Sequence, residues 1–371
     1  MAEAFKENLG RSAIVAIADA IKSQNTAFDK QRFIELASED LDELSLMQRN
    51  RQIAEVLQQT LSSNFEQNCQ DLVAACEEFD PLSEQVKRSG LRSWQSLPIK
   101  EYIGKYGVED IPIALQALAD ITALFSAEFA IRHLLLADED QVLKHLENWC
   151  EHDNHHVRRL VSEGTRPRLP WGFQLTSFIK RPEKTWPLLE RLKDDSSDYV
   201  RLSVANHLND IAKDHPDWLQ NQLQNWVEPQ NKHREKVIRH ACRTLIKQGH
   251  AGTLNMLGYK PLVVADGELS ILTPVVQYGD KLAFSFCFQS TPKSPVIIDY
   301  LIDFQKANGS LAPKVFKWKN TQLSNTGEFN GERSHAIKPV TTRRYYNGHH
   351  ELAILVNGQE VARQSFTLEG C

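Results

Sequence analysis

The chain has 371 residues, of which 41% are apolar and 25% are charged, and this length predicts two or more globular domains. No run of about 18 apolar residues occurs, and the N-terminus carries charges of both signs without an apolar core, so we expect neither a membrane span nor a secretory signal. Six scattered cysteines without a C-x-x-C pair favour a reducing cytoplasm.

The net charge of −5 hides an uneven distribution. Residues 1–150 carry 14 Lys and Arg against 25 Asp and Glu, whereas residues 151–260 carry 18 against 13. Residues 261–371 carry 11 against 10. Positive charge therefore gathers in the middle of the chain, and a local basic surface can attract a phosphate backbone even when the whole molecule is acidic.

Apolar residues in the first 125 positions recur at helical spacing. Breaks are expected near residues 23–25, 62–64 and 80–81, and glycines and prolines between 90 and 112 predict shorter helices there. The apolar positions are Ile14, Ile17, Ala18 and Ile21, then Phe33, Leu36, Ala37, Leu41 and Leu44, then Ile53, Val56, Leu57 and Leu61.

Residues 126–260 contain a repeat. Valines 157, 200 and 237 each open a similar stretch, with spacings of 43 and 37 residues that are typical of HEAT-type helical repeats. Ser126 is predicted to cap a helix with Glu128 in its first turn, and Asp138, Asp153-Asn154 and residues 196–198 are predicted to cap later ones.

One helix of each pair in such an array lines a concave face, so side chains at equivalent positions are expected to share a groove. We expect the helix of residues 200–212 to turn Val204, Leu208 and Ile211 inward, which would leave Asp210 outside the core. The predicted groove residues are Arg158, Arg159, Glu163, Arg166, Arg168, Trp171, Arg201, Asn206 and Asp210.

Each of these residue types has a structural and a functional interpretation. The carboxylates Glu128, Glu163 and Asp210 could be ion-pair members, or could stabilise a developing positive charge and orient water. Trp171 could pack under a loop, or could form an aromatic wall against a sugar or base. The arginines could be a solvated face, but their planar fork suits phosphate oxygens. The run from Cys150 to His156 matches no standard ligand spacing, so we predict no metal.

Strand-like alternation replaces the helical period after residues 258–261. It is clearest at residues 283–288, 296–304 and 350–356, and hairpin-type turns are predicted at Asn308-Gly309, Asn347-Gly348 and Asn357-Gly358. We therefore predict a HEAT-like α-solenoid over residues 1–258, which contains the predicted groove, followed by an immunoglobulin-like β-sandwich over residues 259–371.

Two basic and aromatic runs mark the predicted β domain, residues 314–319 and residues 343–348. They suit contacts with nucleic-acid backbone or groove, so that this domain would clamp DNA. The alternative is that lysines and arginines blunt a solvated strand edge.

Five stretches resemble the AlkC-type DNA alkylation repair proteins, a HEAT-like-repeat branch of DNA glycosylases in which some members carry an immunoglobulin-like C-terminal domain. They are residues 5–10, residues 28–33, residues 127–132, the run V-R-R-L-V-S-E-G-T-R-P-R-L-P-W at residues 157–171, and residues 200–210. The resemblance implies excision of cationic N3-methylated bases, chiefly 3-methyladenine and 3-methylcytosine, from duplex DNA without base flipping. It also implies that Glu128, Trp171 and Asp210 line the cleft at the deoxyribose of the lesion, and that Arg158, Arg159, Arg166 and Arg201 hold backbone phosphates.

The sequence therefore predicts a monofunctional DNA glycosylase that hydrolyses the N-glycosidic bond of alkylated bases. We expect no cofactor, a monomer, and a bacterial cytoplasmic protein at the nucleoid when it acts. The alternative is a non-catalytic HEAT scaffold that binds nucleic acid or protein through the same groove, which would need the arginines but neither Glu128 nor Asp210.

Overall fold

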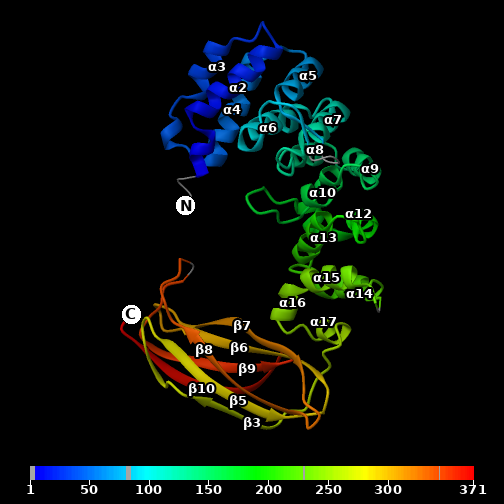
Figure 1. The fold of residues 1–371 in the computed structure, drawn as a ribbon. Helices are drawn as coiled ribbons and strands as arrows, with labels where there is room; N and C mark the ends of the chain where they lie inside the picture. Colours follow the sequence, from blue (N-terminus) through cyan, green and yellow to red (C-terminus); the bar gives the residue numbers. More distant parts are fainter. Residues whose placement is uncertain (1–4, 81–84, 229, 342) are drawn as a thin grey trace. The chain divides into compact units, whose positions relative to one another are not determined.

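The computed structural model describes residues 5–80, 85–228, 230–341 and 343–371. The chain divides into two compact units, Met1–Asp214 with Asn231–Val237, and His215–Gln230 with Ile238–Cys371. Figure 1 shows that the first is helical and that the second joins short helices to a β-sandwich. No helix among the described residues is long and apolar enough to span a membrane.

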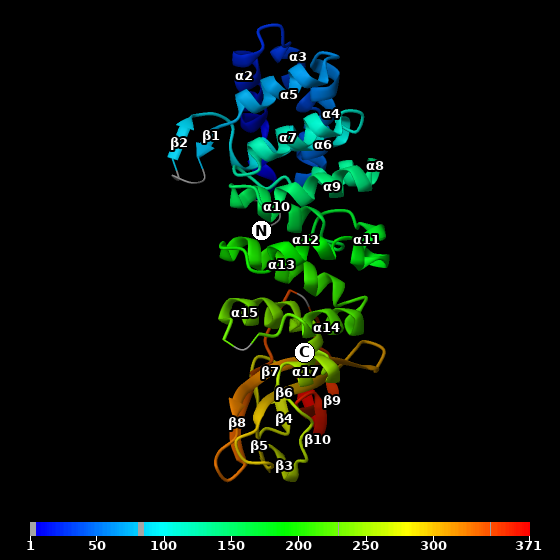
Figure 2. The same cartoon turned by 90° about the vertical axis from the view of Figure 1, so that its right-hand side faces the viewer.

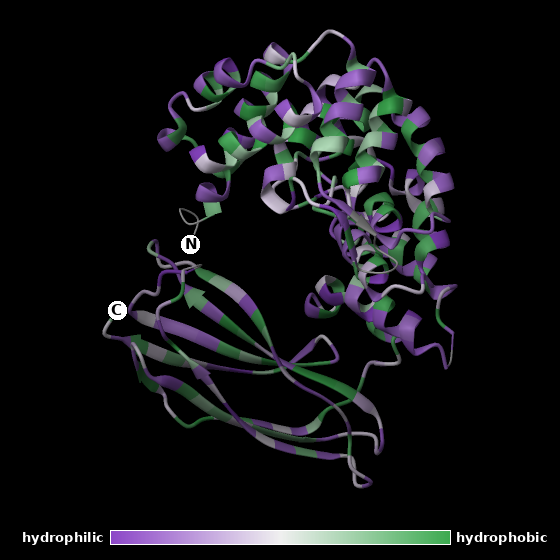
Figure 3. Ribbon diagram, turned by 45° about the horizontal axis from the view of Figure 1, so that its top comes forward, coloured by the Kyte–Doolittle hydropathy of each residue, from purple (hydrophilic) through white to green (hydrophobic). Residues whose placement is uncertain are grey.

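The first unit begins with amphipathic helices whose apolar faces are the predicted ones. Ile14, Ile17 and Ile21 are fully buried, and Figure 3 shows hydrophobic and hydrophilic stretches side by side along these helices. The helices are η1 (Glu7–Leu9), α2 (Arg11–Gln24), α3 (Lys30–Ala37), η2 (Leu41–Glu43), α4 (Leu46–Thr60), α5 (Phe65–Ala75), η3 (Ser93–Ser96), α6 (Leu97–Tyr106) and α7 (Ile111–Ile121).

Two details of this part differ from the sequence prediction. The apolar period through Leu44 does not make one helix, because α3 ends at Ala37 and Asp40 adopts a left-handed conformation (φ 47°) just before the separate helix η2. An antiparallel hairpin of β1 (Glu78–Asp80) and β2 (Gln85–Arg88) was also not predicted. Strands of three and four residues are too short to show a clear alternation.

The repeat helices follow as α8 (Ile131–Ala137), α9 (Glu139–Trp149), α10 (His155–Gly164), α11 (Thr176–Lys180), η4 (Pro182–Lys184), α12 (Trp186–Leu192) and α13 (Asp198–Ile211). Helix α10 packs against α13, and α9 and α12 lie beside them (Figure 2). Val157 and Val200 occupy equivalent buried positions on α10 and α13, as the repeat predicts.

The helix starts in this region are mostly as predicted. Asp138 caps α9 by accepting from Gln141 N, and Asn154 caps α10 by accepting from His156 N. The predicted cap at Ser126 is wrong, because residues 128–130 form a turn and α8 begins only at Ile131. Ser126 instead accepts a hydrogen bond from Arg159.

The second unit contains α14 (Pro216–Gln224), α16 (Arg243–Lys247), α17 (Ala251–Met256) and the last residues of α15 (Lys232–Ala241). Its strands are β3 (Ala265–Ile271), β4 (Val275–Gln277), β5 (Lys281–Gln289), β6 (Pro295–Gln305), β7 (Leu311–Gln322), β8 (Glu328–Ala336), β9 (Gly348–Val356) and β10 (Gln359–Glu369).

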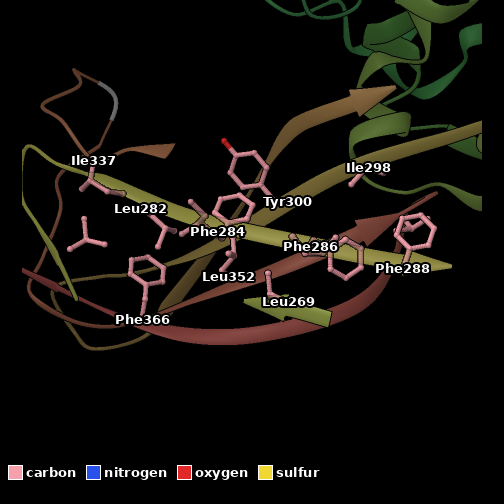
Figure 4. Close-up of a cluster of buried hydrophobic side chains, with 14 of the residues drawn as sticks. Leu269, Leu282, Phe284, Phe286, Phe288, Ile298, Tyr300, Ile337, Leu352 and Phe366 are labelled. Atoms are coloured by element: carbon pink, nitrogen blue, oxygen red, sulfur yellow. The ribbon is translucent and has the colours of Figure 1, made fainter. Parts of the chain in front are cut away.

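These strands form two sheets, in the orders β4-β10-β9-β6-β7 and β3-β5-β8. Aromatic residues of β5 alternate inward, and Figure 4 shows Phe284, Phe286 and Phe288 among Tyr300 of β6 and Leu352 of β9. The two sheets pack together because these apolar side chains are buried between them. This arrangement confirms the predicted immunoglobulin-like sandwich.

The turns of the sandwich are partly as predicted. Asn357 and Gly358 both have positive φ and join β9 to β10, the conformation of a tight type I′ hairpin. Gly309 lies at the turn between β6 and β7. Asn347-Gly348 is not a hairpin, because it precedes β9 whereas β8 belongs to the other sheet.

Candidate functional site

Three predicted site carboxylates of the first unit lie in one continuous ion-pair network. Acidic and basic side chains alternate along it, and they come from the turn before α8, from α10 and the loop after it, and from α13 with the turn that follows. In order, the members are Glu128, Arg159, Glu163, Arg166, Asp210 and Lys213.

Arg159 on α10 joins the first two carboxylates of this network, Glu128 and Glu163. Its Nη1 donates to Glu128 Oε2 (2.5 Å) and to Ser126 Oγ (2.7 Å). Its Nη2 lies 3.5 Å from Glu163 Oε2, one helical turn further along, and its guanidinium lies 4.9 Å from the ring centre of Tyr199. Burial lowers the pKa of Arg159, but Glu128 and Glu163 outweigh it, so the pKa is raised above its ordinary value.

Arg166 joins Glu163 to the third carboxylate of the network, Asp210. Its Nη1 donates to Glu163 Oε1 (2.7 Å) and its Nε donates to Asp210 Oδ2 (2.8 Å). Lys213 Nζ donates to Asp210 Oδ1 (2.9 Å), so both oxygens of Asp210 are paired with cations. Only 1% of the Asp210 side chain is exposed. The prediction that Asp210 lies outside the core is therefore wrong: Arg166 reaches it from the loop after α10, and this pairing makes its burial possible.

The carboxylates of the network differ in how far their side chains are exposed to solvent. The side chain of Glu128 is 16% exposed, whereas that of Glu163 is 6% exposed and accepts a further hydrogen bond from Ser203 Oγ (2.5 Å). Glu128 is therefore the carboxylate of this network that a bound molecule reaches most readily.

His207 supports the network from the interior. Its Nδ1 bonds Ser162 O (2.9 Å) and its Nε2 bonds Thr185 Oγ1 (3.3 Å), so it links α13 to α10 and to the residue before α12. Complete burial lowers the pKa of His207 to about 4, which keeps the ring neutral at neutral pH.

The loop that follows α10 is held by a buried arginine. Arg132 donates to the carbonyl oxygens of Gly164, Arg166 and Phe173, and its guanidinium lies 5.4 Å from the ring centre of Phe173. Burial and the nearby charge of Arg166 lower the pKa of Arg132 to about 10. Arg132 thus fixes both ends of the loop segment that carries Trp171.

Trp171 projects from this loop into solvent. It is 68% exposed and has a left-handed backbone (φ 67°), which is unfavourable for a residue with a side chain. With Phe5, Leu44 and Met47 it lines a mainly apolar cavity of about 570 Å³. The interpretation of Trp171 as a core residue under a loop is therefore wrong, and its ring is available for stacking.

The other predicted arginines have intramolecular partners. Arg158 forms two hydrogen bonds with Asp195 (2.6 and 2.9 Å) and Arg168 forms two with Asp214 (both 2.8 Å). Arg201 pairs with Asp198 and also bonds Asp195 O and His233 Nδ1. Contacts of these arginines with phosphates stay a prediction.

Asn206 lies half-buried on α13, one turn before Asp210. A role of this amide in DNA binding stays a prediction.

Several members of the site could not be recognised from sequence reasoning. Tyr199, Ser203 and Lys213 are ordinary surface-type residues in the chain, and their roles depend on contacts with α10 and the loop after it. Lys213 alone left a signal, because it follows Asp210 at the i+3 spacing of a helical ion pair.

The chain combines helical repeats that hold a buried charge network with an immunoglobulin-like sandwich. Each of these two parts matches a known protein family. The family model "DNA alkylation repair enzyme" matches residues 113–245, and "Uncharacterised protein YhaZ, C-terminal Ig-like domain" matches residues 265–370. The chain is 35% identical to the uncharacterized protein YhaZ of Bacillus subtilis (strain 168) over 96% of each chain.

A solved structure extends this similarity to the fold. The chain is 36% identical to the alkylpurine DNA glycosylase AlkC of Pseudomonas fluorescens bound to DNA that contains an abasic site analog, with a TM-score of 0.86 over 98% of this chain and 99% of that one. The chain belongs to the AlkC-type family of DNA alkylation repair glycosylases.

Proposed function

We propose that this protein excises cationic N3-alkylated bases, 3-methyladenine and 3-methylcytosine, from duplex DNA by hydrolysis of the N-glycosidic bond. The observation that supports this most directly is the network that gathers Glu128, Glu163 and Asp210 with the loop of Trp171. The AlkC relative bound to DNA that contains an abasic site analog supports DNA as the partner.

The chemistry follows from the charge of the lesion. An N3-alkylated base is already a cationic leaving group, so its departure needs no general acid. The remaining requirement is to stabilise the oxocarbenium-like sugar and to place a water molecule. A preorganised carboxylate in a dry site does the first, because its attraction to positive charge grows as that charge develops.

The geometry divides the work between two carboxylates. Glu128, held by Arg159, is the accessible one and would lie against the sugar. Asp210 lies deeper and acts through its field, since charges interact more strongly at low dielectric than in water. Trp171 would pack its exposed ring against the sugar and add a cation–π contribution. No step requires the base to enter a pocket, so the lesion would react without flipping.

The network is complete within one chain, so we propose that the protein acts as a monomer. Arginines would anchor the DNA backbone. Arg168 is the best placed of the predicted residues, because its side chain is 31% exposed and its partner Asp214 is 26% exposed. An exposed pair of this kind contributes little stability and exchanges readily for a phosphate.

The decisive experiment incubates the full chain with methylated duplex DNA and identifies the released bases by chromatography. We expect release of 3-methyladenine and 3-methylcytosine, no release of hypoxanthine, and a strong loss of release in Glu128→Gln. Binding of the same DNA without any base release would instead support the non-catalytic scaffold. Efficient release of hypoxanthine would contradict the charge-based mechanism.

A further inference from the structure

The second unit contains a separate cavity lined by cationic side chains. It has a volume of about 490 Å³, and its lining residues come from the α15–α16 segment and from strands β6 and β7. Five cations and one carboxylate line it, namely Arg239, Arg243, Lys247, Lys314, Lys317 and Asp299. Positive charge in this excess, drawn from both helix and sheet, favours an anionic ligand.

Direct contacts fix the walls of this cavity. Arg239 Nη1 donates to Tyr259 Oη (2.9 Å), and Asn320 Nδ2 of β7 donates to the same oxygen (2.9 Å). Tyr259 also packs with Leu254 and Ile297 in a small buried cluster. The helical segment and the sheet are therefore joined within this unit, and the cavity is part of its packing.

Among the described residues, the lysines of this cavity form no close ion pair, although the charges of Lys247 and Lys317 act on Asp299 and oppose the rise of its pKa that burial causes. Within the described part of the chain, neither Lys247 nor Lys314 nor Lys317 forms an ion pair with a carboxylate at 4.0 Å or less. The pKa of Lys314 is held below its ordinary value by burial and by the positive charges of Arg343 and Lys247. These lysines repel one another, and a bound anion would relieve that repulsion.

Asp299 adds a second requirement. It sits on β6 where the register against β7 shifts, and it accepts a hydrogen bond from Trp318 N–H. The residue is 8% exposed, and its Oδ1 has no hydrogen-bond partner among the described residues. A buried acceptor without a donor is costly and uncommon, so a ligand for this cavity should bring a donor as well as a negative charge.

We propose that this cavity binds a phosphomonoester group. The lysines and arginines would hold its oxygens, and Asp299 would accept a hydrogen bond from the proton that a phosphate monoester carries at and below its second pKa of about 6. A phosphodiester has no such proton, so the continuous backbone of duplex DNA would meet an unpaired carboxylate there. The site is thus distinct from the backbone contacts proposed for the repeats.

Titration calorimetry of the full chain at about pH 6 and constant ionic strength tests this selectivity, because phosphate and its monoesters still carry a proton there. Inorganic phosphate should bind about tenfold more tightly than sulfate or dimethyl phosphate, the effect of one hydrogen bond to a charged group. Thymidine 5′-monophosphate and duplexes with 5′-phosphate or 5′-hydroxyl ends then identify the source of the group. Equal binding of phosphate, sulfate and diester would overturn the proposal, as would equal binding of the two kinds of duplex end with no binding of phosphate or nucleotide.

Variants link the selectivity to named residues. Lys247→Gln and Lys314→Gln should each weaken phosphate binding several-fold, and Asp299→Asn should bring sulfate and phosphate to within about twofold. Lys319→Gln is the matched control, because Lys319 lies on the same strand but contacts the ring of Phe329 outside this cavity. Melting curves verify folding of all four variants, and base excision should stay unchanged in Lys247→Gln and Asp299→Asn, which lie outside the basic runs predicted to contact DNA. A control that weakens binding as much as Lys314→Gln would contradict the site.

Discussion

At the scale of single residues, Asp210 has two separable contributions. It is buried and paired with both Arg166 and Lys213. Asp210→Asn should therefore lower the free energy of unfolding by about 3 kcal/mol, because it takes one of the two carboxylate partners from the buried Arg166. It should also lower the single-turnover excision rate by roughly 10²–10³, the usual effect of losing one preorganised electrostatic group. Affinity for methylated DNA should change little.

Glu163 provides the matched control for that prediction. It is buried in the same network between two arginines, but it is not proposed to act on the positive charge that develops at the sugar. Glu163→Gln should destabilise the protein to a similar extent and slow excision much less. Equal rate losses at matched stability losses would assign Asp210 to structure alone.

Trp171 has a strained backbone and an exposed ring. Relief of the strain should favour stability, whereas loss of the ring should lower activity. Trp171→Gly relieves the left-handed backbone, so the melting temperature should stay constant or rise, consistent with a strain of about 1 kcal/mol. The excision rate should fall roughly 10- to 100-fold, the usual effect of losing an aromatic stacking contact. Trp171→Ala keeps the strain and should match the activity loss without the gain in stability. A wild-type rate in both variants would exclude a role in excision.

At the scale of elements, the sequence predicted those features that depend on local pattern. The period of Val157 and Val200 located α10 and α13, and the alternation of Phe284, Phe286 and Phe288 located β5. The misses have physical reasons. A left-handed Asp40 separates α3 from η2 without interrupting the apolar period. The long side chain of Arg166 makes the burial of Asp210 possible across 44 residues of sequence. Contacts of this kind are set by tertiary packing and leave no local signal.

The arginines on or near α10 and α13 can be ranked by their present partners. Arg168 is paired at the surface, whereas Arg158 is largely buried in its pair with Asp195. Arg168→Ala should flatten the salt dependence of DNA binding by about one unit and leave stability nearly unchanged. Arg158→Ala should lower the melting temperature and change the salt slope less. The measurement is binding isotherms at several salt concentrations with parallel melting curves, and the reverse order of slopes would contradict the ranking.

At the scale of the whole molecule, the compact units do not coincide with the change from helix to strand. The helices end at Met256, yet α17 packs within the second unit, where Leu254 and Tyr259 contact Ile297. Cutting the chain near Gly258 would therefore expose that cluster. A role of the second unit in DNA binding is better tested by point substitution.

Arg344 suits that test, because it belongs to the basic and aromatic run of residues 343–348 that is predicted to contact DNA. Its guanidinium lies 5.5 Å from the ring centre of Tyr346. If this basic segment contacts DNA, Arg344→Ala should weaken binding of any duplex several-fold without lowering the melting temperature. Lys306→Ala, on the exposed turn between β6 and β7, is the control. Unchanged affinity in Arg344→Ala would favour a solvated strand edge.

Buried histidines in both units make stability depend on pH. Burial lowers the pKa to about 4 for His156 and His207 in the first unit and for His335 in the second. Unfolded histidine titrates near 6.5, so between pH 6.5 and 4 the unfolded chain binds more protons, and stability is lost as the pH falls through this range. Asp299 acts in the opposite direction, because burial raises its pKa to about 6.

The pH dependence of stability can be measured at one position, the fully buried His207. It should contribute a slope of up to about 1.4 kcal/mol per pH unit between pH 6.5 and 4, and His207→Gln should remove that slope. The lost hydrogen bonds to Ser162 and Thr185 will lower stability at every pH, so the variant is compared with wild type at pH 8, where the ring is neutral in both folded and unfolded chains. Hydrogen exchange of α10 and α13 amides at pH 8 and pH 5 reports the difference in the first unit alone. A loss of protection between these pH values that is as large in the variant as in wild type would show that His207 is not the group that titrates.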